Sequence, residues 1–183
     1  LTDLSKKKYQ AGTNERKLSD FYKMAMDSAR RNQEGIAPVK PMLDEMEAAK
    51  TLEALRQVQL KYGKMGFGVP FGSYFGADDK NVTMNIFSVG QGGLTLGQKD
   101  WYVNPDKATS DIREAFKKHI VRMFELFGFN HADAQRKMQS VFRFETELAL
   151  VSKSNVELRD PQANYNKMTL AQFEETYPNI PLK

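Results

Sequence analysis

The sequence predicts a mainly α-helical domain with one small inserted β-hairpin. Two observations carry this prediction. Apolar residues recur at helical spacing over most of the chain, and between Val82 and Ile86 they alternate with polar residues instead. At 183 residues the chain is long enough for one well-buried core, and it holds no internal repeat or low-complexity linker. We therefore expect residues 1–183 to form a single, mainly helical domain.

The first third of the chain predicts three helices. One runs from about Glu15 to Arg31 and stops before Gly35, and a second begins at Pro38. A third follows Thr51, whose hydroxyl suits an N-cap, and ends near Gly63. Their apolar stripes, in order, are Leu18, Phe21, Tyr22 and Ala25; Val39, Met42, Leu43 and Met46; and Leu52, Leu55, Val58 and Leu60.

The pattern changes after Phe67 and predicts a hairpin. An aromatic-rich run from Phe71 to Phe75 precedes a polar turn at residues 77–81, and Val82, Met84 and Ile86 then alternate with polar residues. This alternation is typical of a strand with one buried face. The glycine-rich stretch that begins at Gly90 closes the second strand.

Two long helices and one short helix follow. Residues 100–105 are expected to be extended. Apolar residues then form a stripe up to Gly128, and a second long helix runs from about Ala132 to Ser152. Asp160-Pro161 breaks the chain, and Thr169 with Gln172 fits a capping box for a short helix before Pro178. The two stripes are Ile112, Phe116, Ile120, Met123, Phe124 and Phe127; and Ala134, Met138, Val141, Phe142, Leu148 and Val151.

Composition excludes several function classes. The net charge is only +4 and the basic residues are mostly interleaved with acids, so we expect no nucleic-acid partner. Without cysteine the chain has no disulfide, thiolate metal site or cysteine nucleophile. No apolar run approaches the roughly 20 residues that span a bilayer, so we expect no membrane contact from this segment. The chain begins with Leu1, which suggests a mature form or a piece of a longer protein.

The stretch from Gly90 to Tyr102 resembles a phosphate-binding loop at first sight. A P-loop needs lysine directly after its last glycine and then a hydroxyl residue. In this sequence Lys99 comes one position late after Gly97, and Asp100 stands where the hydroxyl belongs. A carboxylate at that place would repel phosphate. Glycines that permit positive φ at the end of a strand are the better interpretation.

Metal and acid–base chemistry receive little support. The only histidines, His119 and His131, lie on different predicted helices, and no H-E-x-x-H is present. Glu145 and Glu147 lie near the apolar stripe of the second long helix. The residues Glu157, Arg159 and Asp160 cluster just past the end of that helix. They fit a structural ion-pair network better than a catalytic carboxylate pair, although the latter stays open. Asn81-Val82-Thr83 also matches a glycosylation sequon, which matters only in a eukaryotic secretory context.

Several motifs, read in order, resemble one family. Gly93-Leu94-Thr95-Leu96-Gly97-Gln98-Lys99-Asp100-Trp101-Tyr102 is similar to the G-L-x-L-P-x-[RK]-D-Y-Y signature of the neprilysin and endothelin-converting-enzyme family of zinc metallopeptidases, which includes bacterial oligoendopeptidase O. Residues 145–149 resemble its E-x-x-L-A helix, and residues 165–170 its Y-N-K-M-T-L segment. Gly97 replaces the usual proline and Trp101 the first tyrosine. The matching positions, taken as structural, are Gly93, Leu94, Asp100, Tyr102, Glu145, Arg159, Asp160, Pro161, Tyr165, Asn166, Lys167 and Thr169.

The resemblance implies an N-terminal helical part of a longer peptidase. The family's zinc ligands, general base and substrate-backbone binder lie in motifs that this sequence lacks, so no catalytic, metal or substrate-binding residue is assigned, and this fragment holds no cofactor. By resemblance, the parent binds zinc, cleaves peptides and works outside the cytoplasm. This part would cap the C-terminal catalytic half and restrict access to peptides. Some faces rich in phenylalanine and methionine would then be covered by that half.

Two rivals remain at this point. The chain is alternatively a stand-alone helical peptide- or protein-binding module. The second rival hypothesis is a self-contained hydrolase that uses Glu145, Glu157 and Asp160.

Overall fold

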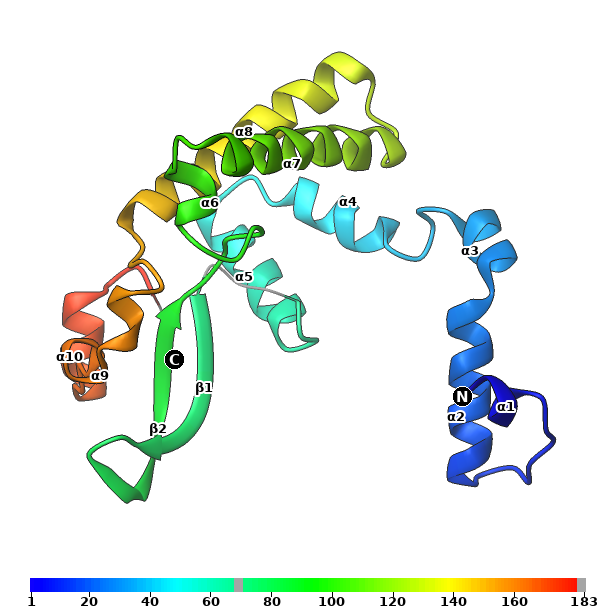
Figure 1. The fold of residues 1–183 in the computed structure, drawn as a ribbon, viewed down its shortest axis with the longest axis horizontal. Helices are drawn as coiled ribbons and strands as arrows, with labels where there is room; N and C mark the ends of the chain where they lie inside the picture. The colour runs from blue at the N-terminus through cyan, green and yellow to red at the C-terminus, as the bar shows by residue number, and fades with distance from the viewer. Residues whose placement is uncertain (68–70, 181–183) are drawn as a thin grey trace. The chain divides into compact units, whose positions relative to one another are not determined.

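The computed structural model describes residues 1–67 and 71–180. The chain divides into two compact units, Leu1–Val58 and Gln59–Lys183 (Figure 1). The regular structure of the described residues consists of helices and one two-stranded antiparallel sheet, which confirms the predicted fold class. The prediction of one domain for residues 1–183 stays a prediction.

The first unit contains short helices. They are α1 (Thr2–Ser5), α2 (Asn14–Met26), α3 (Ser28–Glu34), α4 (Lys40–Ala48) and the start of α5 (Leu52–Gly63). The prediction of a single helix from Glu15 to Arg31 is wrong, because the helix is interrupted at Asp27. Asp27 ends α2 with non-helical backbone angles, and its carboxylate accepts a hydrogen bond from the Arg30 amide, which caps α3. The predicted cap at Thr51 is confirmed by the Ala54 amide, 3.1 Å from Thr51 Oγ1.

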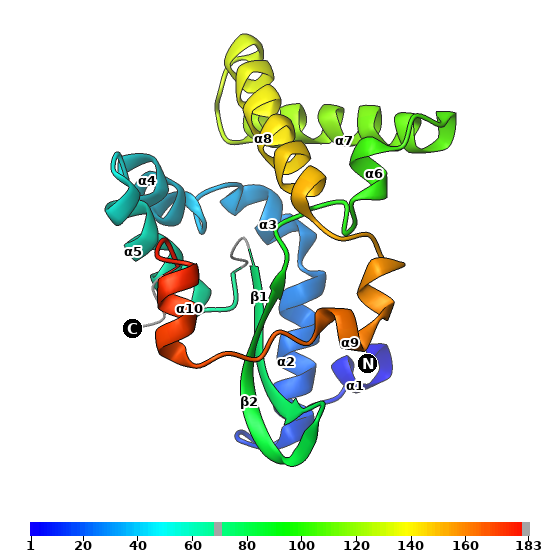
Figure 2. The same cartoon turned by 90° about the vertical axis from the view of Figure 1, so that its left-hand side faces the viewer.

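The second unit is built on two long helices, α7 (Lys107–Leu126) and α8 (His131–Val151), which pack against each other and cross in the view of Figure 2. Asp106 and Asn130 cap their N-termini with side-chain oxygens, and Gly128 takes positive φ in the connection. The two helices and α6 (Asp100–Val103) enclose a core of Tyr102, Phe116, Ile120 and Ala149. Val151, predicted to face inward, is 82% exposed because it lies at the last turn of α8, beyond the core.

Residues 100–105 are not extended as predicted, since α6 forms there. Asn104 has extended angles directly after the helix, so the restriction that Pro105 imposes reaches one residue back and no further. The guanidinium of Arg113 on α7 donates to the carbonyl oxygens of Trp101 and Asn104 at 3.2 and 2.8 Å. It thereby satisfies acceptors at the end of α6 that the short helix leaves free.

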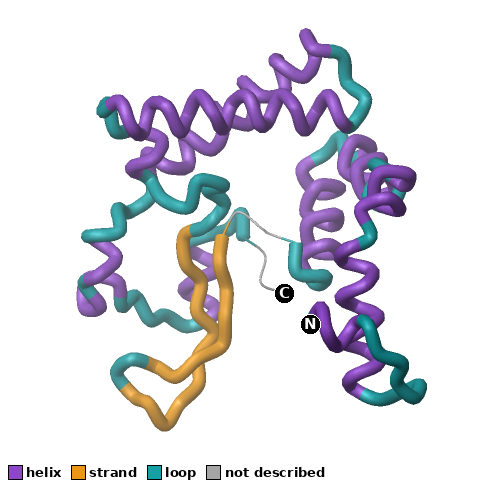
Figure 3. Tube along the Cα trace, turned by 45° about the vertical axis from the view of Figure 1, so that its right-hand side comes forward, coloured by secondary structure: helices purple, strands orange, loops and turns teal. Residues whose placement is uncertain are grey.

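The hairpin consists of β1 (Phe71–Asp78) and β2 (Asn81–Gln91), drawn in orange in Figure 3. Phe75 pairs with Phe87, and the register shifts between Ala77 and Asp78. The strands are where the sequence predicts them, but the expected buried face is not. Val82 is 78% exposed and Met84 48% exposed, because no second layer of this unit packs over them in the described residues.

The chain after α8 forms three short helical segments. These are the 3₁₀ turn η1 (Glu157–Arg159), α9 (Pro161–Asn164) and α10 (Leu170–Thr176). The capping box predicted at the start of α10 is confirmed, since the side chains of Thr169 and Gln172 each receive the other residue's amide. In the described residues no helix combines the length and apolar character needed to cross a membrane.

Candidate functional site

The glycine-rich loop after β2 is shaped by close packing and by positive φ. Gly93 and Gly97 have φ of +77° and +87°, a region that favours glycine. A Cβ on Gly92 would lie 3.0 Å from the backbone nitrogen of Gly72, so no side chain fits beside β1. The prediction that these glycines serve a turn is confirmed.

Glu145 on α8 fixes this loop. Its side chain is buried in the second unit, and its two oxygens accept hydrogen bonds from the Thr95 hydroxyl at 2.7 Å and the Thr95 amide at 3.3 Å. The Tyr102 hydroxyl also donates to Glu145, and it accepts from the Leu96 amide at 3.0 Å. One carboxylate and one phenol therefore satisfy the polar groups of residues 95 and 96 where the loop enters the core.

Tyr102 stays protonated because of this arrangement. Burial of the ring is the main cause that raises the pKa of Tyr102 well above its usual range, and the hydrogen bond to Glu145 is the second. The hydroxyl is thus held as a donor to Glu145. Leu94 and Leu96 from the loop pack against the same core, so the polar contacts and the apolar packing position the loop together.

Lys99 and Gln91 close the C-terminal end of α8 rather than bind a phosphate. The ammonium of Lys99 donates to the carbonyl oxygens of Leu150 and Ser152, at 3.4 and 3.0 Å. The Gln91 amide side chain exchanges two hydrogen bonds of 2.9 Å with the backbone of Lys153. A cation at a helix C-terminus is favoured by unpaired carbonyl groups and by the helix dipole. The ammonium of Lys99, which a phosphate-binding loop would need, therefore binds backbone carbonyl groups instead.

The chain past α8 is held by carboxylates on backbone amides. Glu157 accepts from the amide and the hydroxyl of Ser154, each at 2.7 Å, and these contacts lower the pKa of Glu157. Asp160 caps α9 by accepting from the amides of residues 162 and 163, and Pro161 is its first residue. Arg159 is exposed, and residues 1–67 and 71–180 give it no carboxylate partner. The ion-pair network predicted around Arg159 is therefore not formed in these residues.

These contacts also weigh against a self-contained hydrolase. Both oxygens of Glu145, and one oxygen each of Glu157 and Asp160, accept from donors of this chain, and each contact has a local structural purpose. The other matching residues have structural places too. Asp100 begins α6, Asn166 donates to the carbonyl of residue 164 at 3.3 Å, and Thr169 caps α10.

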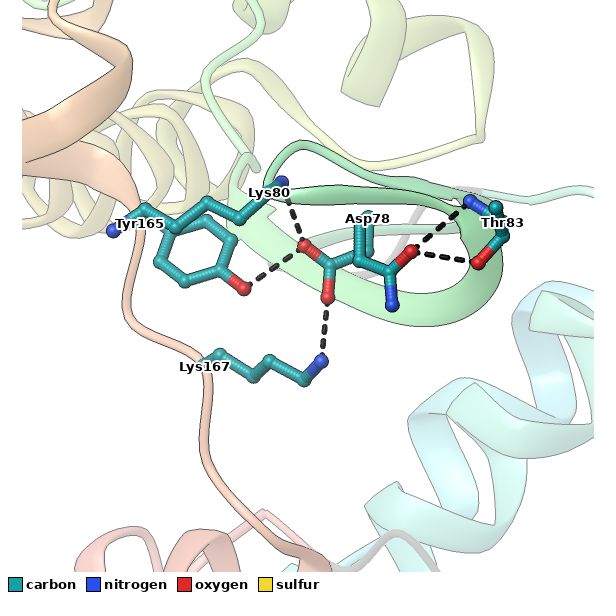
Figure 4. A network of polar contacts seen from close by, with 6 residues as sticks. Asp78, Lys80, Thr83, Tyr165 and Lys167 are labelled. Carbon is teal, nitrogen blue, oxygen red and sulfur yellow. Dashed lines mark hydrogen bonds and ion pairs between the residues drawn. The ribbon is translucent and has the colours of Figure 1, made fainter.

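Asp78, at the end of β1, is the most buried carboxylate of the second unit. It is 0% exposed, and it accepts from the Lys80 amide at 2.9 Å, the Tyr165 hydroxyl at 2.8 Å and the ammonium of Lys167 (Figure 4). The Lys80 ammonium lies 4.3 Å from the centre of the Tyr165 ring. Tyr165 and Lys167, two of the positions matched by resemblance, are thus brought together by an aspartate that lies 87 and 89 residues away.

The charge partners of Asp78 make its contribution to stability depend on pH. The hydrogen bond from Lys167 is the main cause that lowers the pKa of Asp78 from 3.8 to about 2, and the hydrogen bond from the Lys80 amide is the second. A depressed carboxyl pKa stabilises the folded chain above the unfolded pKa, and this stabilisation disappears as the pH falls through the folded pKa. Comparing urea midpoints of the chain and Asp78→Asn should therefore show a difference that is constant above about pH 5 and shrinks between about pH 4 and 2. A difference that grows on acidification would contradict this account.

The histidines do not form a metal site. His119 is exposed on α7, and His131 is exposed at the start of α8, with Nδ1 2.7 Å from a Glu125 oxygen. Within residues 1–67 and 71–180, no group of three or more His, Asp or Glu side chains is placed to hold a metal ion. The side chains of these two ranges therefore do not fit zinc.

The sequence patterns located the positions but missed two partners. Thr95 and Asp78 complete the clusters around Glu145 and Lys167, yet neither was among the positions taken as structural. The signal at Asp78 is its place in the polar turn at residues 77–81. A turn aspartate is common on a surface, so the sequence alone does not mark it as buried.

The whole chain matches a family model. Residues 1–183 match the N-terminal model of peptidase family M13. Because the match covers the full chain, the protein belongs to peptidase family M13, and the resemblance to the neprilysin and endothelin-converting enzymes is confirmed.

Individual relatives agree. The chain is 26% identical over 174 residues to Neprilysin-3 of Drosophila melanogaster, covering 90% of this chain and 22% of that protein. It is 27% identical over 176 residues to mouse endothelin-converting enzyme 1, covering 91% of this chain and 22% of the enzyme. The chain thus spans less than a quarter of the length of these relatives.

Solved structures share the fold. The zinc metalloprotease ZMP1 of Mycobacterium tuberculosis, in complex with an inhibitor, matches with a TM-score of 0.83 and 25% identity, over 95% of this chain and 26% of that one. PepO from Lactobacillus rhamnosis matches with a TM-score of 0.79 and 24% identity, over 97% of this chain and 28% of that one. The PepO match supports the fold alone.

Proposed function

We propose that this chain is the non-catalytic N-terminal part of a zinc metalloendopeptidase that cleaves peptides. In that protein it caps the catalytic half and limits the size of the substrate. The observation that carries the proposal is the match of residues 1–183 to peptidase family M13, combined with relatives of which the chain covers only about a fifth. The partners we propose are the C-terminal half of the same protein and peptide substrates.

Exposed apolar side chains support the capping role. In the first unit Phe21 is 66% exposed and Met26 62%; in the second unit Phe75 is 79% and Val151 82% exposed. Exposed apolar side chains can form a surface that further protein covers. We propose that the catalytic half is what covers part of this surface.

The cofactor and the location follow from the same proposal. The parent would hold zinc through residues outside this chain, and the metal would supply Lewis-acid activation for peptide hydrolysis. An extracytoplasmic location, whether periplasmic, secreted or at the cell surface, rests on resemblance to neprilysin and to endothelin-converting enzymes.

The test begins with the complete reading frame. An H-E-x-x-H motif a few hundred residues downstream, and peptidase activity that a chelator abolishes and zinc restores, are the expected results. The intact enzyme should cleave short peptides. It should leave a folded protein that contains the same peptide sequences uncut. A stop codon shortly after Lys183, with peptide binding by the chain itself, would instead identify a stand-alone binding module.

The exposed apolar groups also predict the behaviour of the isolated chain. We expect it to self-associate or to bind a dye that fluoresces on apolar surfaces. Replacing Phe21, Phe75 and Val151 together with serine should reduce the dye signal, whereas Asn85→Ser, at an exposed polar position on the hairpin, should not. Light scattering that shows a clean monomer without dye binding would count against the prediction.

A further inference from the structure

Residues 165–176, which we name the strap, link α9 to the end of α10 and cross the hairpin (Figure 2). Side chains 166–170 are all exposed, so the first half of the strap is not held by an apolar core. Asn166 makes only a local contact, to the carbonyl of residue 164. Polar contacts, and not apolar packing, must therefore hold this half of the strap on the hairpin.

The carboxylate of Asp78 makes those polar contacts. Figure 4 shows Tyr165 and Lys167 extending from the strap toward its carboxylate, one to each oxygen. The register shift between Ala77 and Asp78 is a site where a strand re-aims a side chain. Lys80, in the hairpin turn, adds a cation over the face of the Tyr165 ring. All these contacts converge on one end of the hairpin.

We infer that Asp78 is a latch, a buried charge that determines whether the strap is docked on the hairpin or detached from it. This inference does not depend on the proposed function. It concerns a conformational equilibrium of this chain, and it assigns a role to Tyr165 and Lys167 that the family match does not supply.

The burial of the two charges is unequal, and this gives the latch a testable signature. The side chain of Asp78 is 1% exposed, whereas that of Lys167 is 42% exposed. Removing Lys167 leaves a charged carboxylate buried without its cation, which is strongly unfavourable. Removing the charge of Asp78 leaves a lysine that water can solvate. Lys167→Met should therefore release the strap more than Asp78→Asn does.

Hydrogen exchange measured on the full chain tests the latch. α10 has only seven residues, and helices this short are not stable alone, so a detached strap should lose its helix. We expect the amides of residues 170–177 to exchange about tenfold faster in Lys167→Met, and less than that in Asp78→Asn. Trypsin should also cut after Lys167 sooner in Asp78→Asn. In the double variant exchange should return toward that of Asp78→Asn, because no buried charge remains.

Matched measurements separate a latch from general unfolding. Asp111→Asn removes the same group from an exposed ion pair with Lys107 on α7, and it should leave the strap unchanged. Trp101 is the only tryptophan and packs on the core, so its fluorescence reports the α7–α8 pair. Unchanged exchange in the strap would overturn the inference. An equal rise over α7 and α8, or no relief of Lys167→Met by Asp78→Asn, would overturn it as well.

Discussion

Glu145→Ala is expected to lower the free energy of unfolding of the second unit by about 3 kcal/mol. The substitution removes the acceptor for the Thr95 amide, the Thr95 hydroxyl and the Tyr102 hydroxyl at once. Tyr102 is 5% exposed, so its hydroxyl would be left without this partner inside the core. Urea unfolding followed by Trp101 fluorescence, with far-ultraviolet circular dichroism as a second probe, measures the change.

Glu147→Ala is the matched control. Glu147 lies on the same helix, is exposed, and is 4.0 Å from Arg143, so its removal should change stability by less than about 0.5 kcal/mol. Tyr102→Phe combined with Glu145→Ala should be less damaging than the sum of the two single changes, since they break one shared contact. Full additivity would mean that the hydrogen bond between these side chains does not couple them.

Phe116→Ala is expected to cost about 3 to 5 kcal/mol, because it opens a cavity between α7 and α8. Phe116 is 8% exposed, belongs to the core with Tyr102 and Ile120, and lies 6.5 Å from the Phe142 ring centre. The surrounding helices are long and capped at their N-termini, so they are not free to collapse fully into the space.

The same truncation on the solvent side should have little effect. Phe144 is 58% exposed on α8, and Phe144→Ala should change the unfolding free energy by about 0.5 kcal/mol or less. Thermal and urea unfolding of both variants gives the comparison. Equal losses for Phe116 and Phe144 would show that the core is not where the structure places it.

Local sequence signals predicted the elements that depend on neighbours in the chain. Helical periodicity located both ends of α8 and the C-terminal end of α7 closely, and Thr169 with Gln172 marked the start of α10. These succeed because helix periodicity and capping depend on residues three or four apart. The break at Asp27 was missed because an aspartate followed by serine reads equally well as a polar helix face or as a new cap.

Predictions of burial were less successful. Alternation at Val82 and Met84 correctly indicated a strand, but burial of a strand face requires another layer, which these residues do not encode locally. The prediction that residues 100–105 are extended failed for a related reason. The carbonyls of α6 are satisfied by Arg113 from the next helix, a contact between residues nine and twelve positions apart.

The sequence by itself determined the family, the mainly helical class and the absence of a phosphate loop, since motif order, periodicity and the identities of Lys99 and Asp100 are all properties of the linear chain. Only the tertiary structure decided what the matching residues do. It joined Glu145 to Thr95 across 50 residues and Lys167 to Asp78 across 89. Buried charges and hydroxyls find partners wherever the fold brings donors and acceptors together, and sequence distance does not limit that choice.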